Sequence, residues 1–140
     1  MKSKLSTLWM FATLNYLYCD VVSLMDHNLL RQYLVGRING IDVSQGFLLA
    51  AGILVEVPIA MVLLSRILQH RVNRWANIVA GGVMTVVQTA SLLAGSPASY
   101  YVFFSAIEIL TTAVTVWLAW RWAAAPIVNQ PATSISLEPN

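Results

Sequence analysis

Six side chains with polar chemistry fall within stretches of the sequence that are otherwise apolar. They are two glutamates, an aspartate, a tyrosine and two amides: Glu56, Glu108, Asp20, Tyr16, Asn15 and Gln88. Asn15 and Glu56 lie at the middle of their stretches, and Gln88 and Glu108 lie about three residues, roughly 4–5 Å, to one side. Asp20 lies about five residues, roughly 7–8 Å, to the same side. These residue types at similar depths predict a polar slab that could bind a small ligand or a proton.

The two glutamates carry the sharpest expectation, because burial in an apolar medium disfavours the charged form of a carboxylic acid. A second carboxylate nearby disfavours that form further. No Lys or Arg lies within the apolar stretches, and Arg31 and Arg66 lie only at their ends. We therefore expect at least one of Glu56 and Glu108 to be protonated at neutral pH, able to donate a hydrogen bond and to carry a proton.

The composition defines the setting of these residues. The chain has 140 residues, of which 58% are hydrophobic and only 10% are charged. A soluble domain carries about 25% charged residues, and a disordered chain needs low hydrophobicity and high charge, so both classes are excluded. The net charge of +2, with no basic stripe, indicates no nucleic-acid partner.

Motifs of catalytic chemistry are missing from the sequence. Its one cysteine, Cys19, has no second thiol for disulfide exchange. No His/Cys set has zinc spacing, and neither a glycine-rich phosphate loop nor a nucleophile elbow is present. We therefore assign no catalytic residue, metal or cofactor, and we do not expect enzymatic activity from this chain alone.

Four apolar stretches are long enough for membrane-spanning helices, which need roughly 20 residues each. They run over about 5–25, 46–65, 75–94 and 100–120. The predicted fold is all-α: an integral membrane four-helix bundle of antiparallel up-and-down spans within one domain, 1–122. An outer loop, 26–45, contains a short interfacial helix from His27 to Val35 and a turn at Asn39-Gly40. A tail, 123–140, is expected to be a disordered cytoplasmic segment.

The flanking charges predict the orientation of the spans. One side holds six basic residues, Lys2, Lys4, Arg66, Arg71, Arg74 and Arg121, and the opposite side holds only Arg31 and Arg37. The positive-inside rule then puts both termini in the cytoplasm and the protein in the inner (plasma) membrane. The tryptophans lie near the cytoplasmic span ends, as interfacial anchors would: Trp9, Trp75, Trp117, Trp120 and Trp122.

Polar and small residues also recur at helical spacing, which predicts the faces that turn away from lipid. The first stripe is Thr13, Tyr16, Asp20 and Ser23; the third span gives Asn77, Gly81, Thr85, Gln88 and Ser91; the fourth gives Tyr101, Ser105, Glu108, Thr112 and Thr115. In the second span Gly52 and Glu56 share a face, and Pro58 predicts a kink beside the acid. Gly81-Gly82 permits close helix packing, within the bundle in preference to a dimer. Asp26 and His27 would lie at the outer mouth of the site.

Several segments together resemble a known family. They are Leu5–Trp9, Asn15–Asp26, Gln45–Leu49 with Glu56–Met61, and Arg74–Asn77. The chain resembles, over about residues 4–122, an uncharacterised family of small bacterial four-span membrane proteins catalogued as a domain of unknown function. A weaker resemblance, in size and span number, is to DoxX-like four-helix membrane proteins, some of which are associated with quinone or thiosulfate oxidation.

Three functions remain open from the sequence. The first is proton-linked binding or transport of a small solute through the six-residue site, either in one bundle or in a homodimer. The second is a quinone-associated subunit, in which a protonated Glu near Tyr16 and Gln88 hydrogen-bonds a quinone carbonyl. The third is a structural accessory protein of a membrane complex, whose polar residues only join helices at about 0.6 kcal/mol per contact. The lipid bilayer is a partner in all three.

Overall fold

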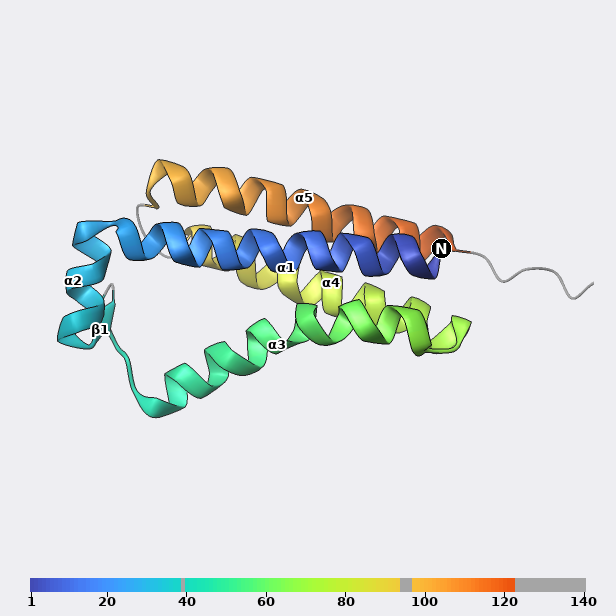
Figure 1. Ribbon diagram of the computed structural model, residues 1–140, viewed down its shortest axis with the longest axis horizontal. Coiled ribbons are helices and arrows are strands. Elements are labelled where there is room, and N and C mark those ends of the chain that lie inside the picture. The colour runs from blue at the N-terminus through green and yellow to red at the C-terminus, as the bar shows by residue number, and fades with distance from the viewer. Residues whose placement is uncertain (39, 94–96, 123–140) are drawn as a thin grey trace, which may run out of the picture.

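A computed structural model describes residues 1–38, 40–93 and 97–122 of the chain. Within them the protein is all-α, apart from one β-hairpin whose two strands have two residues each (Figure 1). The elements are α1 (Lys2–Met25), α2 (His27–Val35), β1 (Arg37–Ile38), β2 (Ile41–Asp42), α3 (Gln45–Ile67), α4 (His70–Leu93) and α5 (Ser99–Arg121). The predicted all-α class is therefore confirmed. The predicted tail lies outside the described residues.

The four long helices α1, α3, α4 and α5 are each long and apolar enough to cross a membrane. Three of them match the predicted spans closely, but α4 begins at His70 where the apolar stretch begins only near Trp75. The extra turn carries Arg71, Asn73 and Arg74, which lower the hydrophobicity without disfavouring a helix. A prediction from hydrophobic length alone therefore starts this helix too late, because it leaves out the polar first turn.

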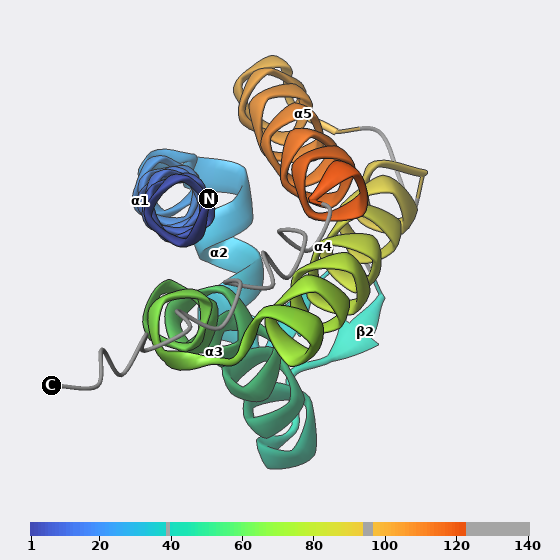
Figure 2. The same cartoon turned by 90° about the vertical axis from the view of Figure 1, so that its right-hand side faces the viewer.

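The long helices are arranged as a four-membered ring when viewed along the bundle (Figure 2). Helix α1 packs against α3 and α5, and α4 packs mainly against α5 and more sparingly against α3. Helices α3 and α5 are therefore diagonal to each other, and α4 and α5 are neighbours as their short connection predicts. The centre of this ring is where side chains from α1, α4 and α5 meet.

Helix α3 packs along only half of its length. In Figure 1 its second half lies against the bundle, while its first half diverges from α1 and α4. Residues 45–56 are exposed except for the half-buried Leu54, and the buried positions are Pro58, Met61 and Ser65. Pro58 has no N–H to donate to the carbonyl of Leu54, which weakens the helix where the two halves join. The predicted kink position thus coincides with the point at which α3 leaves the bundle.

A single residue joins α1 to α2. Asp26 ends α1 and caps α2, because its Oδ1 accepts hydrogen bonds from the backbone N–H of Asn28 at 2.9 Å and of Leu29 at 3.3 Å. Gly36, with φ of 75°, ends α2 in a left-handed conformation that favours glycine. The short helix predicted over His27–Val35 is confirmed.

The hairpin that follows α2 pairs Arg37 with Asp42 and Ile38 with Ile41. Gly40 lies in its turn with φ of 83°, which suits glycine. Asn39, the other residue of the predicted turn, lies outside the described residues.

Helices α4 and α5 approach closely at Gly81. A Cβ atom at this position would lie 2.6 Å from Cγ2 of Val116 and 3.4 Å from the carbonyl oxygen of Thr112. A Cβ at Gly82 would meet nothing within 4 Å. The interpretation of the glycine pair as a packing device within the bundle is therefore confirmed for Gly81, while Gly82 lies on the outer surface of the helix pair.

Candidate functional site

Glu108 is the buried acid of the bundle. Its side chain is 1% exposed on α5, where it faces α1. The side-chain amide of Asn15 donates to Oε1 of Glu108 at 3.2 Å and to the backbone carbonyl of Phe104, also at 3.2 Å. Asn15 therefore joins α1 to α5 by two polar contacts at the depth of the acid.

Two buried polar atoms beside this contact have no hydrogen-bond partner. They are Oε2 of Glu108 and the hydroxyl of Tyr16. Tyr16 follows Asn15 in α1, packs against the core of Trp9, Met61 and Met84, and lies within electrostatic range of Glu108. The great majority of buried polar groups are hydrogen-bonded. The described residues contain two more such unpartnered atoms, Nε2 of His70 and Nε of Arg74, at the start of α4 and away from this contact. The pair on α1 and α5 marks a place where a ligand, a water molecule or a proton would complete the structure.

Other buried polar side chains extend this region along α4 and α5. Gln88 donates from Nε2 to the hydroxyl of Ser105 at 2.7 Å. The hydroxyls of Thr85 and Thr112 are 2.8 Å apart, and Thr112 also donates to the backbone carbonyl of Glu108 at 3.0 Å. The stripe predicted on the fourth span is buried at Ser105, Glu108, Thr112 and Thr115. Unlike Oε2 of Glu108 and the hydroxyl of Tyr16, the amide nitrogen of Gln88 and the hydroxyls of these threonines have partners within the protein.

The structure brings four of the six predicted residues together: Asn15, Tyr16, Gln88 and Glu108. Asp20 is exposed but lies within electrostatic range of Glu108. Asp20 lies at the edge of the face through which α1 packs: Ser23, on the same predicted stripe, and Cys19 are buried, whereas Asp20 is not. Asp20 therefore borders the buried group without belonging to it.

The expectation that Glu56 shares this interior is wrong. Glu56 is exposed on α3, and α3 faces the bundle through Pro58, Met61 and Ser65. Two residues before Pro58, Glu56 is rotated by about 200° around the helix axis, which turns it away from the bundle. Only one of the two glutamates, Glu108, is a buried carboxyl group.

The two residues predicted at the outer mouth have other surroundings. Asp26 caps α2, and the hydroxyl of Tyr100 donates to its Oδ2 at 3.5 Å. His27 is exposed on α2. Over the part of the chain that the structure describes, no group of three or more His, Cys, Asp or Glu side chains is placed to hold a metal ion.

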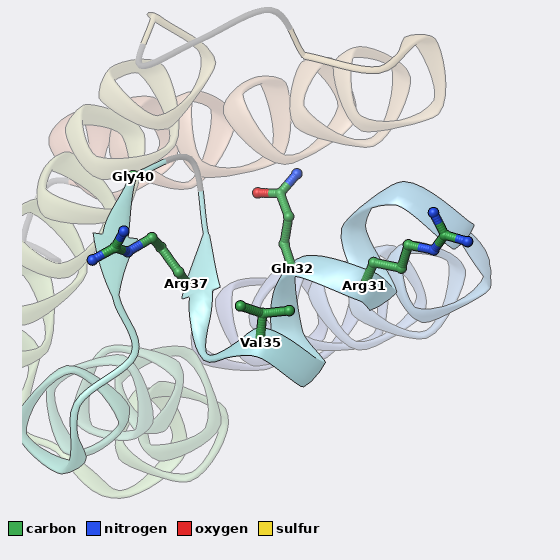
Figure 3. Close-up of a pocket in the computed structure, with 5 residues that line it drawn as sticks. All are labelled: Arg31, Gln32, Val35, Arg37 and Gly40. Atoms are coloured by element: carbon green, nitrogen blue, oxygen red, sulfur yellow. The ribbon is translucent and has the colours of Figure 1, made fainter.

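Two surface hollows lie away from these residues. One, of about 470 Å³, lies between α2 and the hairpin (Figure 3) and is lined by Arg31, Gln32, Val35, Arg37 and Gly40. Its Arg37 is paired with Asp42, Nε to Oδ1 at 2.8 Å. The other, of about 500 Å³, is an apolar groove along α4 and α5 lined by Gly82, Thr85, Val86, Ala113, Val116, Trp117 and Trp120. Neither hollow contains one of the predicted site residues.

A second polar cluster, which the sequence analysis missed, joins α1, α3 and α4 near their other end. The indole N–H of Trp9 donates to Oδ1 of Asn77 at 2.7 Å, and the hydroxyl of Ser65 donates to the same atom at 3.2 Å. Asn77 donates from Nδ2 to Oδ1 of Asn73 at 2.6 Å, and Asn73 donates from Nδ2 to the carbonyl of Ser65 at 2.6 Å. We call these four residues, Trp9, Ser65, Asn73 and Asn77, the inner network.

The inner network corrects the interpretation of Trp9 as an interfacial anchor. Trp9 is 1% exposed, whereas Trp75, Trp117 and Trp120 lie on the surface as expected of anchors. The spacing of four between Asn73 and Asn77 was the available signal, since it puts both amides on one face. Beside the network, Ser6 donates to the carbonyl of Val62 at 2.8 Å and accepts from Nε of Arg66 at 3.0 Å.

Four helices that are long and apolar enough to cross a membrane, around a buried polar interior, are consistent with a small four-helix membrane protein. The chain belongs to DUF6326, a family of unknown function whose sequence profile matches residues 1–128. The family resemblance inferred from the sequence is thereby confirmed, while the likeness to DoxX proteins stays a prediction. No curated protein and no solved structure matches the chain.

Proposed function

We propose that the protein binds a small polar solute at Glu108 and Tyr16 and couples that binding to a proton on Glu108. The observation that carries this proposal is the pair of buried, unpartnered atoms, Oε2 of Glu108 and the hydroxyl of Tyr16. A membrane protein gains nothing in stability from leaving such atoms unsatisfied, since each costs about 1–3 kcal/mol. A ligand that hydrogen-bonds both atoms removes that cost.

The surroundings of Glu108 support a proton as the coupled ion. Its one partner within the protein is the neutral amide of Asn15, which bonds Oε1 and leaves Oε2 free to hold a proton. Desolvation disfavours a bare carboxylate at such a site. Loss of the proton to a solute or to water then requires a compensating contact, and the nearby exposed Asp20 provides a route toward the surface.

The proposed orientation of the protein in the membrane rests on the basic residues that flank the long helices. With six basic residues flanking one end of the bundle, the proposal places both termini in the cytoplasm of a bacterial cell and the protein in its inner membrane. The Glu108 region then lies on the outer side of the midplane. A cysteine introduced near the N-terminus, labelled with a membrane-impermeant maleimide in intact and in opened cells, tests this orientation: labelling only in opened cells supports it.

Infrared spectroscopy of the protein in lipid tests the protonated acid directly. The measurement is made in a Glu56→Gln background, which removes the other acid in the middle of a long helix, one that is turned away from the bundle. In that background we expect a carboxylic acid C=O band that persists above pH 7, is lost on adding Glu108→Gln and is retained with Glu108→Asp at a shifted frequency. A spectrum without such a band in the Glu56→Gln protein, or a band that Glu108→Gln leaves in place, contradicts the proposal.

Proton flux tests the coupling. In proteoliposomes with an internal pH-sensitive dye and an imposed pH gradient, we expect Glu108→Gln to reduce flux at least tenfold and Glu56→Gln to leave it within twofold. Tyr16→Phe removes only the second unpartnered atom and is expected to give an intermediate loss. If all three variants conduct as the wild type does, the buried acid is a packing group and the structural alternative holds.

A quinone headgroup is the second candidate ligand, because the hydroxyls of Tyr16 and of a protonated Glu108 could both donate to quinone carbonyl oxygens. The test is titration with a short-chain ubiquinone, followed by quenching of tryptophan fluorescence. Saturable quenching that Tyr16→Phe weakens would favour a quinone over a polar solute. Quenching that is linear in quinone concentration and insensitive to Tyr16 would exclude this ligand.

A further inference from the structure

Glu56 is the central residue of α3, with eleven residues on either side of it in Gln45–Ile67. It is exposed, although α3 is long and apolar enough to cross a membrane. An acidic side chain at the centre of a spanning helix costs about 2.5–3.5 kcal/mol on insertion scales. Such residues almost always face a bundle interior, a water-filled cavity or a polar partner. Within one copy of the chain, Glu56 faces none of these.

The outward face of α3 is a continuous stripe through the whole helix. It is formed by Gln45, Leu49, Gly52, Glu56, Leu63 and Ile67, all of which are exposed. These positions follow steps of three, four and seven, which keep them on one side of an α-helix. The stripe is opposite to Pro58, Met61 and Ser65, the positions through which α3 meets the bundle.

Movement of α3 within one chain does not cover this face. The diverging half of α3 could swing toward α1 and α4 about Pro58, but that motion presses Leu54 and its neighbours against the bundle. Glu56 lies about 200° from Leu54 around the axis, so it would still point away. The partner that satisfies Glu56 must therefore come from outside the chain.

We propose that a second copy of this chain covers the outward face of α3, with the two Glu56 carboxyl groups hydrogen-bonded to each other across a two-fold axis. A two-fold interface brings the same patch of both copies together, so the patch must complement itself. A carboxyl group that carries a proton both donates and accepts, so two of them sharing protons complement each other. The side-chain amide of Gln45 has the same property.

Three further observations favour a second copy as the occupant. A Cβ atom at Gly52, one turn from Glu56, would meet nothing within 4 Å, so a neighbouring helix can approach the backbone there. No Lys or Arg lies in the middle of any span, so another copy offers the acid a carboxyl partner and not an ion pair. Helix α3 is about 34 Å long at 1.5 Å per residue, which gives the stripe contact along the full thickness of a bilayer.

The interface is independent of the proposed solute site. Glu108, Asn15 and Tyr16 lie on α1 and α5, whereas the outward face belongs to α3 alone and points away from the bundle. The two proposals can therefore fail separately: loss of dimers leaves the protonated band of Glu108 in place, and loss of that band leaves the dimer.

The oligomeric state in a bilayer tests the proposal. The full chain, labelled with one fluorophore per copy, is reconstituted into liposomes over a range of protein-to-lipid ratios and counted by single-molecule photobleaching. We expect two-step traces for the wild type and for Glu56→Gln, whose amide pairs with its twin. Glu56→Leu should raise the dissociation constant at least tenfold. Monomers in the wild type, or dimers unaffected by Glu56→Leu, would overturn the proposal.

Cysteine cross-linking locates the interface. In a Cys19→Ser background that retains the wild-type circular dichroism, Leu49→Cys is compared with Leu110→Cys. The two leucines are each 66% exposed, but Leu49 lies on the outward face of α3 and Leu110 on the lipid side of α5. With a copper–phenanthroline oxidant we expect disulfide dimers from Leu49→Cys and few from Leu110→Cys. Equal yields, or a preference for Leu110→Cys, would contradict the assigned surface.

Discussion

The two polar regions of the bundle both contain buried amide, hydroxyl and aromatic side chains, but they differ in whether all the polar atoms have hydrogen-bond partners. In the inner network, the indole N–H, both amides and the serine hydroxyl all have partners within the protein, and the four residues are almost completely buried. In the Glu108 region, one carboxyl oxygen and the Tyr16 hydroxyl have none. A network that is complete in itself has no capacity left for a ligand, whereas an incomplete one does.

Packing separates the two regions in the same way. The hydrogen bonds described above between α3 and other helices all involve its second half, from Val62 to Arg66. Beside the Glu108 region, α3 diverges from the bundle. At one end of the molecule α3 is therefore hydrogen-bonded to α1 and α4, whereas the other end depends mainly on α1, α4 and α5. This difference indicates a fixed end that maintains the fold and a more open end, where the proposed ligand site lies.

The largest effect on stability is expected at the fixed end. Asn77→Leu removes the acceptor of Trp9 and Ser65 and the donor to Asn73. Since each buried polar group left unpaired costs about 1–3 kcal/mol, we expect a loss of about 3 kcal/mol in the free energy of unfolding. Steric trapping or denaturant unfolding in bicelles measures it.

Thr89→Leu is the control for that change. Thr89 lies on the same helix but is exposed and bonds only to the carbonyl of Thr85 in its own helix. Its replacement should change the free energy of unfolding by less than about 0.5 kcal/mol. Equal effects of the two substitutions would show that the inner network is no more important than any polar residue of α4.

The next largest loss of stability is expected from disturbing the contact between α4 and α5. Gly81→Ala places a methyl group 2.6 Å from Cγ2 of Val116, and such overpacking costs about 1–3 kcal/mol. Gly82→Ala is the control, because a Cβ at the neighbouring Gly82 meets nothing within 4 Å. It should be neutral or slightly stabilising, since alanine favours a helix. The ratio of the two effects, read from unfolding in the same bicelles, tests the side of α4 that packs; a reversed order would contradict the close approach at Gly81.

Glu108→Leu should affect stability far less than Asn77→Leu does. It removes an unpartnered carboxyl oxygen, and Asn15 keeps its bond to the carbonyl of Phe104. We expect unfolding to be unchanged or about 1 kcal/mol less favourable, with proton flux lost, as is common where a functional group is replaced by an apolar one. If Glu108→Leu destabilises the protein as much as Asn77→Leu, both regions are structural and the contrast between them fails.

The smallest effect is expected at the hairpin, outside both regions. Asp42→Asn breaks the ion pair with Arg37, whose two side chains are 64% and 75% exposed. Exposed pairs contribute about 0.2–1 kcal/mol, so the melting temperature should scarcely change. A large decrease would mean that the hairpin helps to hold the open end of the bundle.

The positions of the four long helices could be predicted from the sequence because hydrophobic length and helix geometry determine them. The buried group of Asn15, Gln88 and Glu108 could also be predicted, since a polar side chain in an apolar stretch usually turns away from lipid. For these residues the position along the helix was enough to predict that they lie at similar depths, and the structure places them together.

The face of each helix that packs could not be predicted with the same success. In a helix that is apolar on all sides, such as α3, no stripe indicates the direction of its neighbours, and so Glu56 was assigned to the interior. Trp9 was assigned to the interface for a related reason: its depth suits an anchor, and only the positions of Asn73 and Asn77 on another helix show that it is buried. Both errors concern rotation about a helix axis, which tertiary contacts determine.

The inner network also has a consequence for biosynthesis. Its residues are separated in the chain, and Asn77 follows Trp9 by 68 positions. When the ribosome has made α1 and α3, the indole of Trp9 therefore still lacks its acceptor. Until α4 is made, these two helices can be joined by the bonds of Ser6 to Val62 and Arg66, but not by the inner network. A nascent chain arrested before His70 should accordingly be the form most sensitive to proteases.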